Sequence, residues 1–265
     1  MDGMTPEARV IAEADGAVGR ITFDNQTRRN AMTLAMWQGL WDAVEQFAAD
    51  PAIRVIVLTG AGDKAFVAGA DISEFEALRA TKEGVARYNS IHEGADLALY
   101  HCPKPTIAMI RGSCVGGGMG IALACDLRVA AENARFGITA ARLGLGYDAT
   151  GIRKLVNTVG PEAAAEILYT GSIFDAEDAR AMGILRHVVP VEDLAPVTDG
   201  IAGRIAEAAP LTVRASKAAI RAAQRRDDGA DAEVDILVKA CFDSADYQEG
   251  RRAFLEKRKP AFRGV

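Results

Sequence analysis

The stretch that decides the fold is Val115-Gly116-Gly117-Gly118-Met119-Gly120-Ile121-Ala122. Three consecutive glycines open it, and apolar residues continue through Leu123 and Ala124, which predicts a short helix that is buried on all sides. Glycines at a helix start expose backbone N–H groups, and the helix dipole makes that end positive. We therefore expect this helix start to be able to stabilise a developing oxyanion.

A second candidate donor lies upstream, in Phe66-Val67-Ala68-Gly69-Ala70-Asp71-Ile72. Ala70 follows a glycine, and Asp71 can cap the turn that comes next. Each segment alone is typical of a structural turn. As a pair at strand ends, the N–H groups of Ala70 and Gly117 indicate an oxyanion hole for a thioester or amide carbonyl.

Strands and helices alternate on both sides of the glycine segment. Thr33 can cap a helix that runs to about Ala49, and residues 8–24 read as a hairpin with its turn at Asp15-Gly16. Further strands are expected at 53–59, 105–110, 127–131 and 187–189, and further helices at 82–100 and 152–159. This order predicts an α/β core with parallel crossovers.

From residue 192 onward the pattern is only helical. The expected helices cover 192–208, 211–225, 230–242 and 244–258. We therefore expect an α/β core over residues 1–191 and a C-terminal helical region over residues 192–265. Such a region packs on the core or on a neighbouring subunit.

The composition of the 265 residues is that of a globular protein, with 49% hydrophobic and 25% charged residues. A net charge of -5 gives no support to a nucleic-acid partner. The four cysteines form no CxxC pair, which indicates free thiols in a reducing compartment. We expect a cytoplasmic protein without a membrane partner, because no signal-peptide pattern and no apolar run of ~20 residues is found.

Several motifs that are typical of other enzyme classes are incomplete here or lack the neighbouring elements that those classes require. Gly60 to Ala65 match a loose dinucleotide pattern, but no helix pattern opens at these glycines, so a tight turn is favoured over a nicotinamide site. The three histidines have no metal-ligand spacing, and no GxSxG elbow is present. The sequence predicts neither a metal nor a separate cofactor.

A set of segments spread over nearly the whole chain is specific when taken together. They are residues 29–32 (Arg-Asn-Ala-Met), 64–72, 103–108, 112–126, 134–137, 171, 176–183 and 254–260. In these segments the chain resembles the enoyl-CoA hydratase/isomerase (crotonase) superfamily. The resemblance implies a crotonase-like superhelical core of repeated ββα turns with a C-terminal helical trimerisation region. It also implies a homotrimer or a dimer of trimers.

The same resemblance implies an acyl-CoA thioester as substrate, with coenzyme A present only as part of it. The oxyanion hole of the superfamily falls on the N–H groups of Ala70 and Gly117. Ala68 and Ile72 match positions near the adenine, and Arg28 or Arg29 would lie near the CoA phosphates. The expected substrate-binding residues are Arg28, Ala68, Asp71, Ile72, Tyr147, Phe254 and Lys257.

The chain departs from the superfamily at two catalytic positions. Typical hydratases carry two glutamates that position a water molecule and move its proton, and those positions hold Gly120 and Ala140 here. Two-carboxylate catalysis, worth about 10²–10⁴-fold per group, therefore cannot operate as it does in those hydratases.

One acid remains, Asp148, on a glycine-rich turn ahead of a helix. In members that resemble dienoyl-CoA isomerases an aspartate at this position moves a proton. In members that resemble 4-chlorobenzoyl-CoA dehalogenase it is the nucleophile, although a tryptophan of that enzyme is replaced by Ala140 and its histidine falls near His92 or Glu93. Asp148 as a helix cap alone stays an alternative. Desolvation in an acyl pocket would favour its protonated form, which suits a base.

The leading hypothesis is an enoyl-CoA hydratase/isomerase family enzyme that stabilises an enolate at Ala70 and Gly117. Asp148 then serves as the proton-transfer base, with Tyr147 and either Glu93 or His92 assisting. The reaction stays open between double-bond isomerisation, hydration by a rearranged site and hydrolysis. One alternative is a hydrolase or dehalogenase-like enzyme with Asp148 as nucleophile. Another is a CoA-thioester binder without catalysis.

Overall fold

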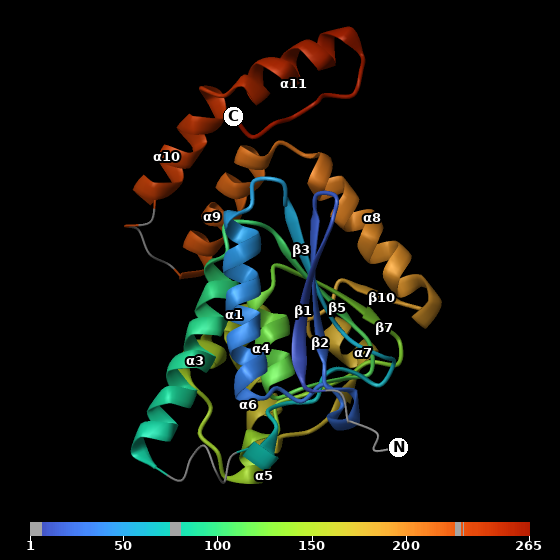
Figure 1. The fold of residues 1–265 in the computed structure, drawn as a ribbon, viewed down its shortest axis with the longest axis vertical. Helices are drawn as coiled ribbons and strands as arrows, with labels where there is room; N and C mark the ends of the chain where they lie inside the picture. Colours follow the sequence, from blue (N-terminus) through green and yellow to red (C-terminus); the bar gives the residue numbers. More distant parts are fainter. Residues whose placement is uncertain (1–6, 75–80, 226–228, 230) are drawn as a thin grey trace.

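The computed structural model describes residues 7–74, 81–225, 229 and 231–265 (Figure 1). Its strands are β1 (Arg9–Asp15), β2 (Val18–Asp24), β3 (Val55–Gly60), β4 (Ala65–Val67), β5 (Thr106–Ile110), β6 (Ser113–Val115), β7 (Leu127–Ala131), β8 (Arg135–Gly137), β9 (Phe174–Asp175) and β10 (His187–Val189). Its α-helices are α1 (Leu34–Ala49), α3 (Lys82–His101), α4 (Gly117–Ala124), α5 (Ala140–Leu143), α6 (Ala149–Thr170), α7 (Ala176–Ala181), α8 (Leu194–Glu207), α9 (Pro210–Arg225), α10 (Asp231–Phe242) and α11 (Ala245–Glu256).

Two sheets form the centre of the molecule. The larger has the order β1-β2-β3-β5-β7-β10, in which β1 and β2 pair antiparallel and the other neighbours pair parallel. The smaller has the order β4-β6-β8-β9, with an antiparallel pair only at β8 and β9. Consecutive pairs β3–β4, β5–β6 and β7–β8 each place one strand in each sheet and lead into α3, α4 and the α5–α6 segment. The expectation of repeated ββα turns is thus confirmed.

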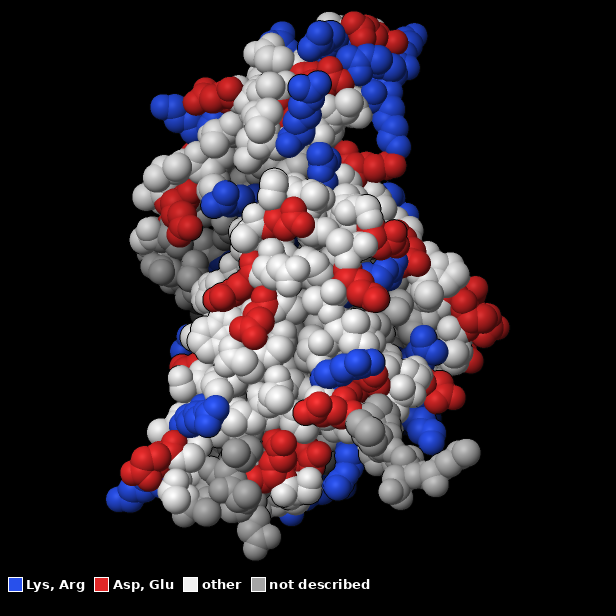
Figure 2. Space-filling view, in the orientation of Figure 1, with Lys and Arg blue, Asp and Glu red and all other residues white. Residues whose placement is uncertain are grey.

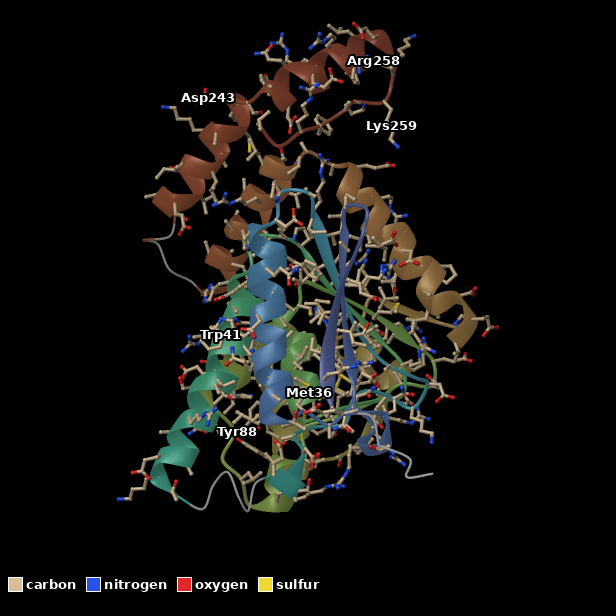
Figure 3. All side chains as sticks on the ribbon, viewed as in Figure 1. Met36, Trp41, Tyr88, Asp243, Arg258 and Lys259 are labelled. Atoms are coloured by element: carbon tan, nitrogen blue, oxygen red, sulfur yellow. The ribbon has the colours of Figure 1, made fainter. Side chains whose placement is uncertain are left out.

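The larger sheet is covered on both faces, as its apolar strands require. Helices α1, α3 and α4 pack in the main core with Ile56, Leu58 and Ala108. On the other face, Leu194 and Ala202 of α8 pack in a second apolar cluster. Trp41 of α1 points toward α3 (Figure 3), where its ring leaves no room for a side chain at Gly94.

The C-terminal helices differ in how they meet the core. Helix α8 packs on the larger sheet, whereas α10 and α11 extend beyond the sheets at the upper end of Figure 1. On the face drawn in Figure 2, acidic and basic side chains are interspersed, and both signs are dense over α11. The division between residues 191 and 192 stays a prediction.

The predicted elements match the observed ones with small differences. The strand expected from Ile53 begins at Val55, because the Ile53 N–H closes a turn on the Asp50 carbonyl at 3.1 Å. The helix expected at 152–159 starts earlier, at Ala149, and is interrupted at Gly160, where φ is 79°. Residue 230, the expected start of one helix, lies outside the described residues. None of the described helices is both long and apolar enough to cross a lipid bilayer.

Candidate active site

Two backbone N–H groups that have no hydrogen-bond partner among the described residues line one cavity wall. Ala70 forms an isolated parallel bridge with Met32, whose hydrogen bonds run from Met32 N–H to Gly69 O (2.8 Å) and from Asp71 N–H to Met32 O (2.9 Å). On this segment the two bonds use the carbonyl of the residue before Ala70 and the N–H of the residue after it, so the Ala70 N–H takes no part in the bridge. Gly117 is the first residue of α4, where N–H groups have no partner in the helix. In the part of the chain that the structure describes, both N–H groups thus remain available to a ligand.

The glycine run brings these two segments into contact. Gly116 caps α4 with a φ of 55°, a conformation that favours glycine. A Cβ atom at Gly118 would lie 2.2 Å from the Val67 carbonyl oxygen, so only glycine lets α4 pack on β4. A Cβ atom at Gly117 would lie 3.8 Å from the Gly69 carbonyl carbon, so the two donor segments are adjacent.

The cavity in front of these donors has a volume of about 770 Å³, within the ~300–1,000 Å³ of small-molecule sites. It is bounded by the Ala68–Ala70 segment, the start of α4, α3, and the segment from Ile138 to Gly151. Ala68, Ala70, Ile72, Gly117 and Tyr147 all line it, and Asp148 does too. The structure thus brings together residues from segments that are distant in the sequence.

Asp148 is both a helix cap and a wall residue of the cavity. Its Oδ1 accepts a hydrogen bond from the Gly151 N–H at 2.7 Å, so the cap interpretation is confirmed. No hydrogen bond to its Oδ2 is recorded among the described residues, which leaves this oxygen for a ligand. In the free chain Asp148 is exposed on a surface turn, so its desolvation in an acyl pocket stays a prediction for the bound state.

Tyr147 occupies the space beside Gly120. A Cβ atom at Gly120 would lie 3.7 Å from the Tyr147 hydroxyl, so this hydroxyl lies next to the position where hydratases are expected to carry their first acid. Burial raises the pKa of Tyr147, and the negative charge of Asp148 adds to that rise. The hydroxyl therefore stays protonated and can donate a hydrogen bond into the cavity.

An ion pair in the cavity wall was not foreseen from the sequence. Lys154 of α6, whose side chain is buried, donates to the Asp96 carboxylate of α3. The available signal was helical periodicity, since Lys154 shares a buried face of α6 with Gly151 and Leu155. A lysine among apolar neighbours on one helix face predicts a partner, but the partner's identity needs the fold.

Aromatic rings line the side of the cavity formed by α1 and α3. The ring of His92 meets that of Trp37 edge to face, with centroids 4.5 Å apart, and stacks on Tyr88 at 6.2 Å. Glu93, beside His92, also lines the cavity. His92 and Glu93 are thus both placed where an assisting group was expected.

Four of the expected substrate-binding residues do not line this cavity. Arg28 and Asp71 lie together near its rim, with Arg28 Nη1 3.9 Å from Asp71 Oδ1, and the same Asp71 oxygen accepts from the Ser73 N–H at 3.0 Å. Phe254 and Lys257 lie at the end of α11, far from α5 in Figure 1. One chain therefore does not bring its C-terminal residues to the donor segments.

Comparisons with known proteins agree with this geometry. A model of the family "Enoyl-CoA hydratase/isomerase" matches residues 13–265. The crotonyl-CoA hydratase of Syntrophomonas wolfei is 35% identical over 256 residues, which cover 96% of this chain and 97% of that protein. The methylmalonyl-CoA decarboxylase of Escherichia coli is 35% identical over 251 residues, covering 93% and 95%.

A solved structure extends the likeness to three dimensions. The crystal structure of an enoyl-CoA hydratase/carnithine racemase from Magnetospirillum magneticum matches with a TM-score of 0.92 and 38% identity, covering 97% of this chain and 96% of that one. The chain therefore belongs to the enoyl-CoA hydratase/isomerase family, and its fold is the crotonase-like α/β fold.

Proposed function

We propose that this protein transfers a proton next to the carbonyl group of an acyl-CoA thioester, with double-bond isomerisation as its reaction. The observation that supports this most directly is the shared cavity of the Ala70 and Gly117 N–H groups and the Asp148 carboxylate. Gly120 and Ala140, in the same cavity wall, supply no acid. Both relatives compared above, a crotonyl-CoA hydratase and a methylmalonyl-CoA decarboxylase, are named as enzymes of CoA thioesters.

In this reaction the thioester oxygen accepts hydrogen bonds from the Ala70 and Gly117 N–H groups. Asp148 removes a proton from C2 of a 3-enoyl thioester, and the electron pair moves onto the thioester oxygen. The protonated Asp148 returns the proton to C4, so the double bond moves to C2–C3 and the carboxylate is restored. Each backbone donor contributes about 10²–10³-fold, and the base about 10²–10⁴-fold.

The test is turnover of 3-enoyl, 2-enoyl and aromatic acyl-CoA thioesters by wild type and by Asp148→Asn. We expect turnover of a 3-enoyl thioester that falls about 10²–10⁴-fold in the variant, with thioester binding unchanged. Equal turnover in the variant would overturn the role of Asp148. Binding of thioesters by wild type with no turnover of any would instead identify a binder without catalysis.

Isotope labelling distinguishes Asp148 acting as a nucleophile from Asp148 acting as a base. If Asp148 attacked a carbon of the acyl group and displaced a leaving group such as halide, its carboxylate would become an ester. Water attacking the carboxyl carbon would then release the product and leave a solvent oxygen in the side chain. After turnover in H₂¹⁸O, mass spectrometry of the Asp148 peptide should therefore find no label. Incorporation of ¹⁸O would show that Asp148 acts as a nucleophile and not as a base.

We further propose that the chain forms a homotrimer, alone or as a dimer of trimers, and that Phe254 and Lys257 approach a CoA bound by another copy. The exposed apolar side chains of α11 support this, since Phe254 is 84% and Leu255 79% exposed. Large apolar side chains gathered on one surface mark an interaction site.

A further inference from the structure

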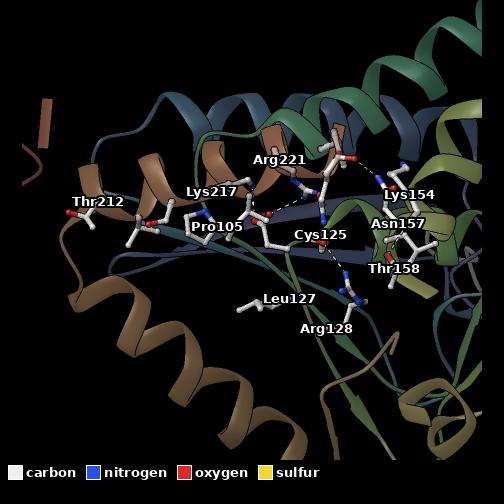
Figure 4. A pocket seen from close by; sticks show the side chains of 17 residues that line it. Pro105, Cys125, Leu127, Arg128, Lys154, Asn157, Thr158, Thr212, Lys217 and Arg221 are labelled. Carbon is white, nitrogen blue, oxygen red and sulfur yellow. Dashed lines mark hydrogen bonds and ion pairs between the residues drawn. The ribbon is translucent and has the colours of Figure 1, made fainter. Parts of the chain in front are cut away.

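A second cavity lies between α9, the first residues of β7 and the middle of α6 (Figure 4). We call it the α9 cavity. Its volume is about 330 Å³, which is at the lower end of the ~300–1,000 Å³ of small-molecule sites. Lys154, Asn157 and Thr158 come from α6 at one end, and Thr212 lies at the opposite end (Figure 4). The proposed reaction uses none of its residues.

The wall of the α9 cavity carries more positive than negative charge. The cations are Arg128, Lys154, Lys217 and Arg221, and the carboxylate among the lining residues is Asp126. Lys217 and Arg221 share Asp126, at 2.7 and 3.0 Å, while Lys154 pairs with Asp96. Within the described residues no carboxylate pairs with Arg128. Four cations thus face two carboxylates, an excess of two positive charges.

Both carboxylate oxygens of Asp126 already accept hydrogen bonds, so Asp126 does not balance the remaining positive charge of the cavity wall. Its Oδ2 accepts hydrogen bonds from the Thr106 N–H and hydroxyl and from Lys217, and its Oδ1 accepts from Arg221. The C-terminal carbonyls of α4 also accept from the two arginines. A helix end supplies only about half a negative charge. The excess positive charge is therefore reduced but not cancelled.

Both arginines line the cavity and keep N–H donors for which no partner is found among the described residues. Arg221 Nε is buried, and no partner for it is found within the described residues. Arg128 donates only to backbone carbonyls among the contacts recorded for it, those of Ile184, Ala122 and Cys125. Burial lowers the pKa of Arg128, and the like charge of Arg221 lowers it further. A bound anion would offset the positive charge of both arginines, since buried charges require partners.

The rest of the wall is apolar. The side chains without polar groups that line it are Pro105, Leu123, Leu127, Val213 and Ile220. A small inorganic anion would fill only the basic part of such a cavity. A ligand with a carboxylate at one end and a hydrocarbon chain at the other satisfies both parts, because guanidinium groups bind carboxylates with paired hydrogen bonds.

We propose that the α9 cavity binds a short-chain monocarboxylate, with its carboxylate at Arg128 and Arg221 and its hydrocarbon chain against Leu127 and Ile220. This site is separate from the active-site cavity, although Lys154 stands in the wall of both. It does not depend on the reaction proposed above.

The test is isothermal titration of the full chain with hexanoate, hexan-1-ol and inorganic phosphate. We expect one hexanoate per chain, and binding of the alcohol and of phosphate at least about tenfold weaker, since each lacks one half of the match. If phosphate bound as tightly as hexanoate, the proposed contact between the cavity and a hydrocarbon chain would be overturned. Absence of saturable hexanoate binding would overturn the site.

Amino-acid substitutions show which of the two cavities binds the hexanoate ion. Ile220 is 60% exposed, so Ile220→Glu and Ile220→Lys should both fold, which circular dichroism checks. Both variants lose the apolar contact of Ile220, but only the first adds charge repulsion, so Ile220→Glu should weaken hexanoate binding about tenfold more than Ile220→Lys does. Ala140→Glu adds the same charge to the active-site cavity and should leave hexanoate affinity unchanged. Weakening by Ala140→Glu and not by Ile220→Glu would place the ion in the active-site cavity and overturn the proposal.

Discussion

Asp148 caps α6, and we propose that it is also the catalytic base; one substitution can separate these two roles. Asparagine caps a helix as well as aspartate does, whereas alanine does not cap. We therefore expect Asp148→Asn to keep the free energy of unfolding within about 0.5 kcal/mol of wild type, and Asp148→Ala to lower it by about 0.5–2 kcal/mol. Urea denaturation measures both. An asparagine variant as unstable as the alanine variant would show that charge, not capping, stabilises this turn.

Tyr147 gives a dependence of stability on pH. Its pKa is raised in the folded chain by burial and then by the charge of Asp148, whereas an unfolded phenol ionises near pH 10. Above about pH 10 the unfolded state thus binds fewer protons than the folded state, so the free energy of unfolding falls as pH rises.

Phenylalanine at this position removes the titrating group. Between pH 9 and 11 we expect wild type to lose on the order of 1 kcal/mol more stability than Tyr147→Phe. Urea denaturation at a series of pH values checks the difference. Parallel pH curves for the two proteins would mean that the Tyr147 hydroxyl is not held in its neutral form.

For single residues, the sequence predicted which residues form the site better than it predicted the surroundings of each. Ala70, Gly117, Tyr147 and Asp148 were all predicted as site residues and all line one cavity. The exposure of Asp148 and the partner of Lys154 could not be predicted, because both depend on contacts between segments that are distant in the sequence. Asp96 and Lys154 are 58 residues apart.

Among the elements, α4 depends most on its glycines. A methyl group at Gly118 would collide with the Val67 carbonyl, which is backbone and cannot rotate away. We expect Gly118→Ala to destabilise the fold by about 1–3 kcal/mol, as overpacking does, and to lower kcat by displacing the Gly117 N–H.

Gly203 of α8 is the matched control, because a methyl group there would have no heavy atom within 4 Å. Alanine at this helix position should be neutral or stabilise by up to about 1 kcal/mol. Thermal denaturation and steady-state kinetics of both variants compare the two sites. A Gly118→Ala protein with normal stability and turnover would contradict the packing of α4 on β4.

The strands of the larger sheet and most of the longer helices were predictable because their signals are local, whereas the two- and three-residue strands β4, β6, β8 and β9 were not expected. Thr33 caps α1 as expected, with its hydroxyl accepting from the Met36 N–H at 3.1 Å. Strand pairing across ββα units carries no such local signal. The assignment of β4, β6 and β8 to a separate sheet therefore came only with the structure.

For the whole molecule, the exposed apolar side chains of α11 predict association. The chain mass is 28.1 kDa, and we expect light scattering to give three or six times this value. Phe254→Asp should shift the protein toward smaller species, since it places a charge on a surface meant to be buried. Leu143→Asp, at an exposed apolar residue near the active-site cavity, should not. Wild type that scatters as a single chain would contradict the proposed assembly.

The proposed reaction requires Asp148 to exchange a proton with the carbon next to a thioester carbonyl held at Ala70 and Gly117. Proton NMR of a bound acyl-CoA in D₂O measures that exchange directly at C2. Wild type should exchange the C2 proton, and Asp148→Asn should slow the exchange about 10²–10⁴-fold while the dissociation constant stays the same. Exchange at the wild-type rate in Asp148→Asn would contradict the account.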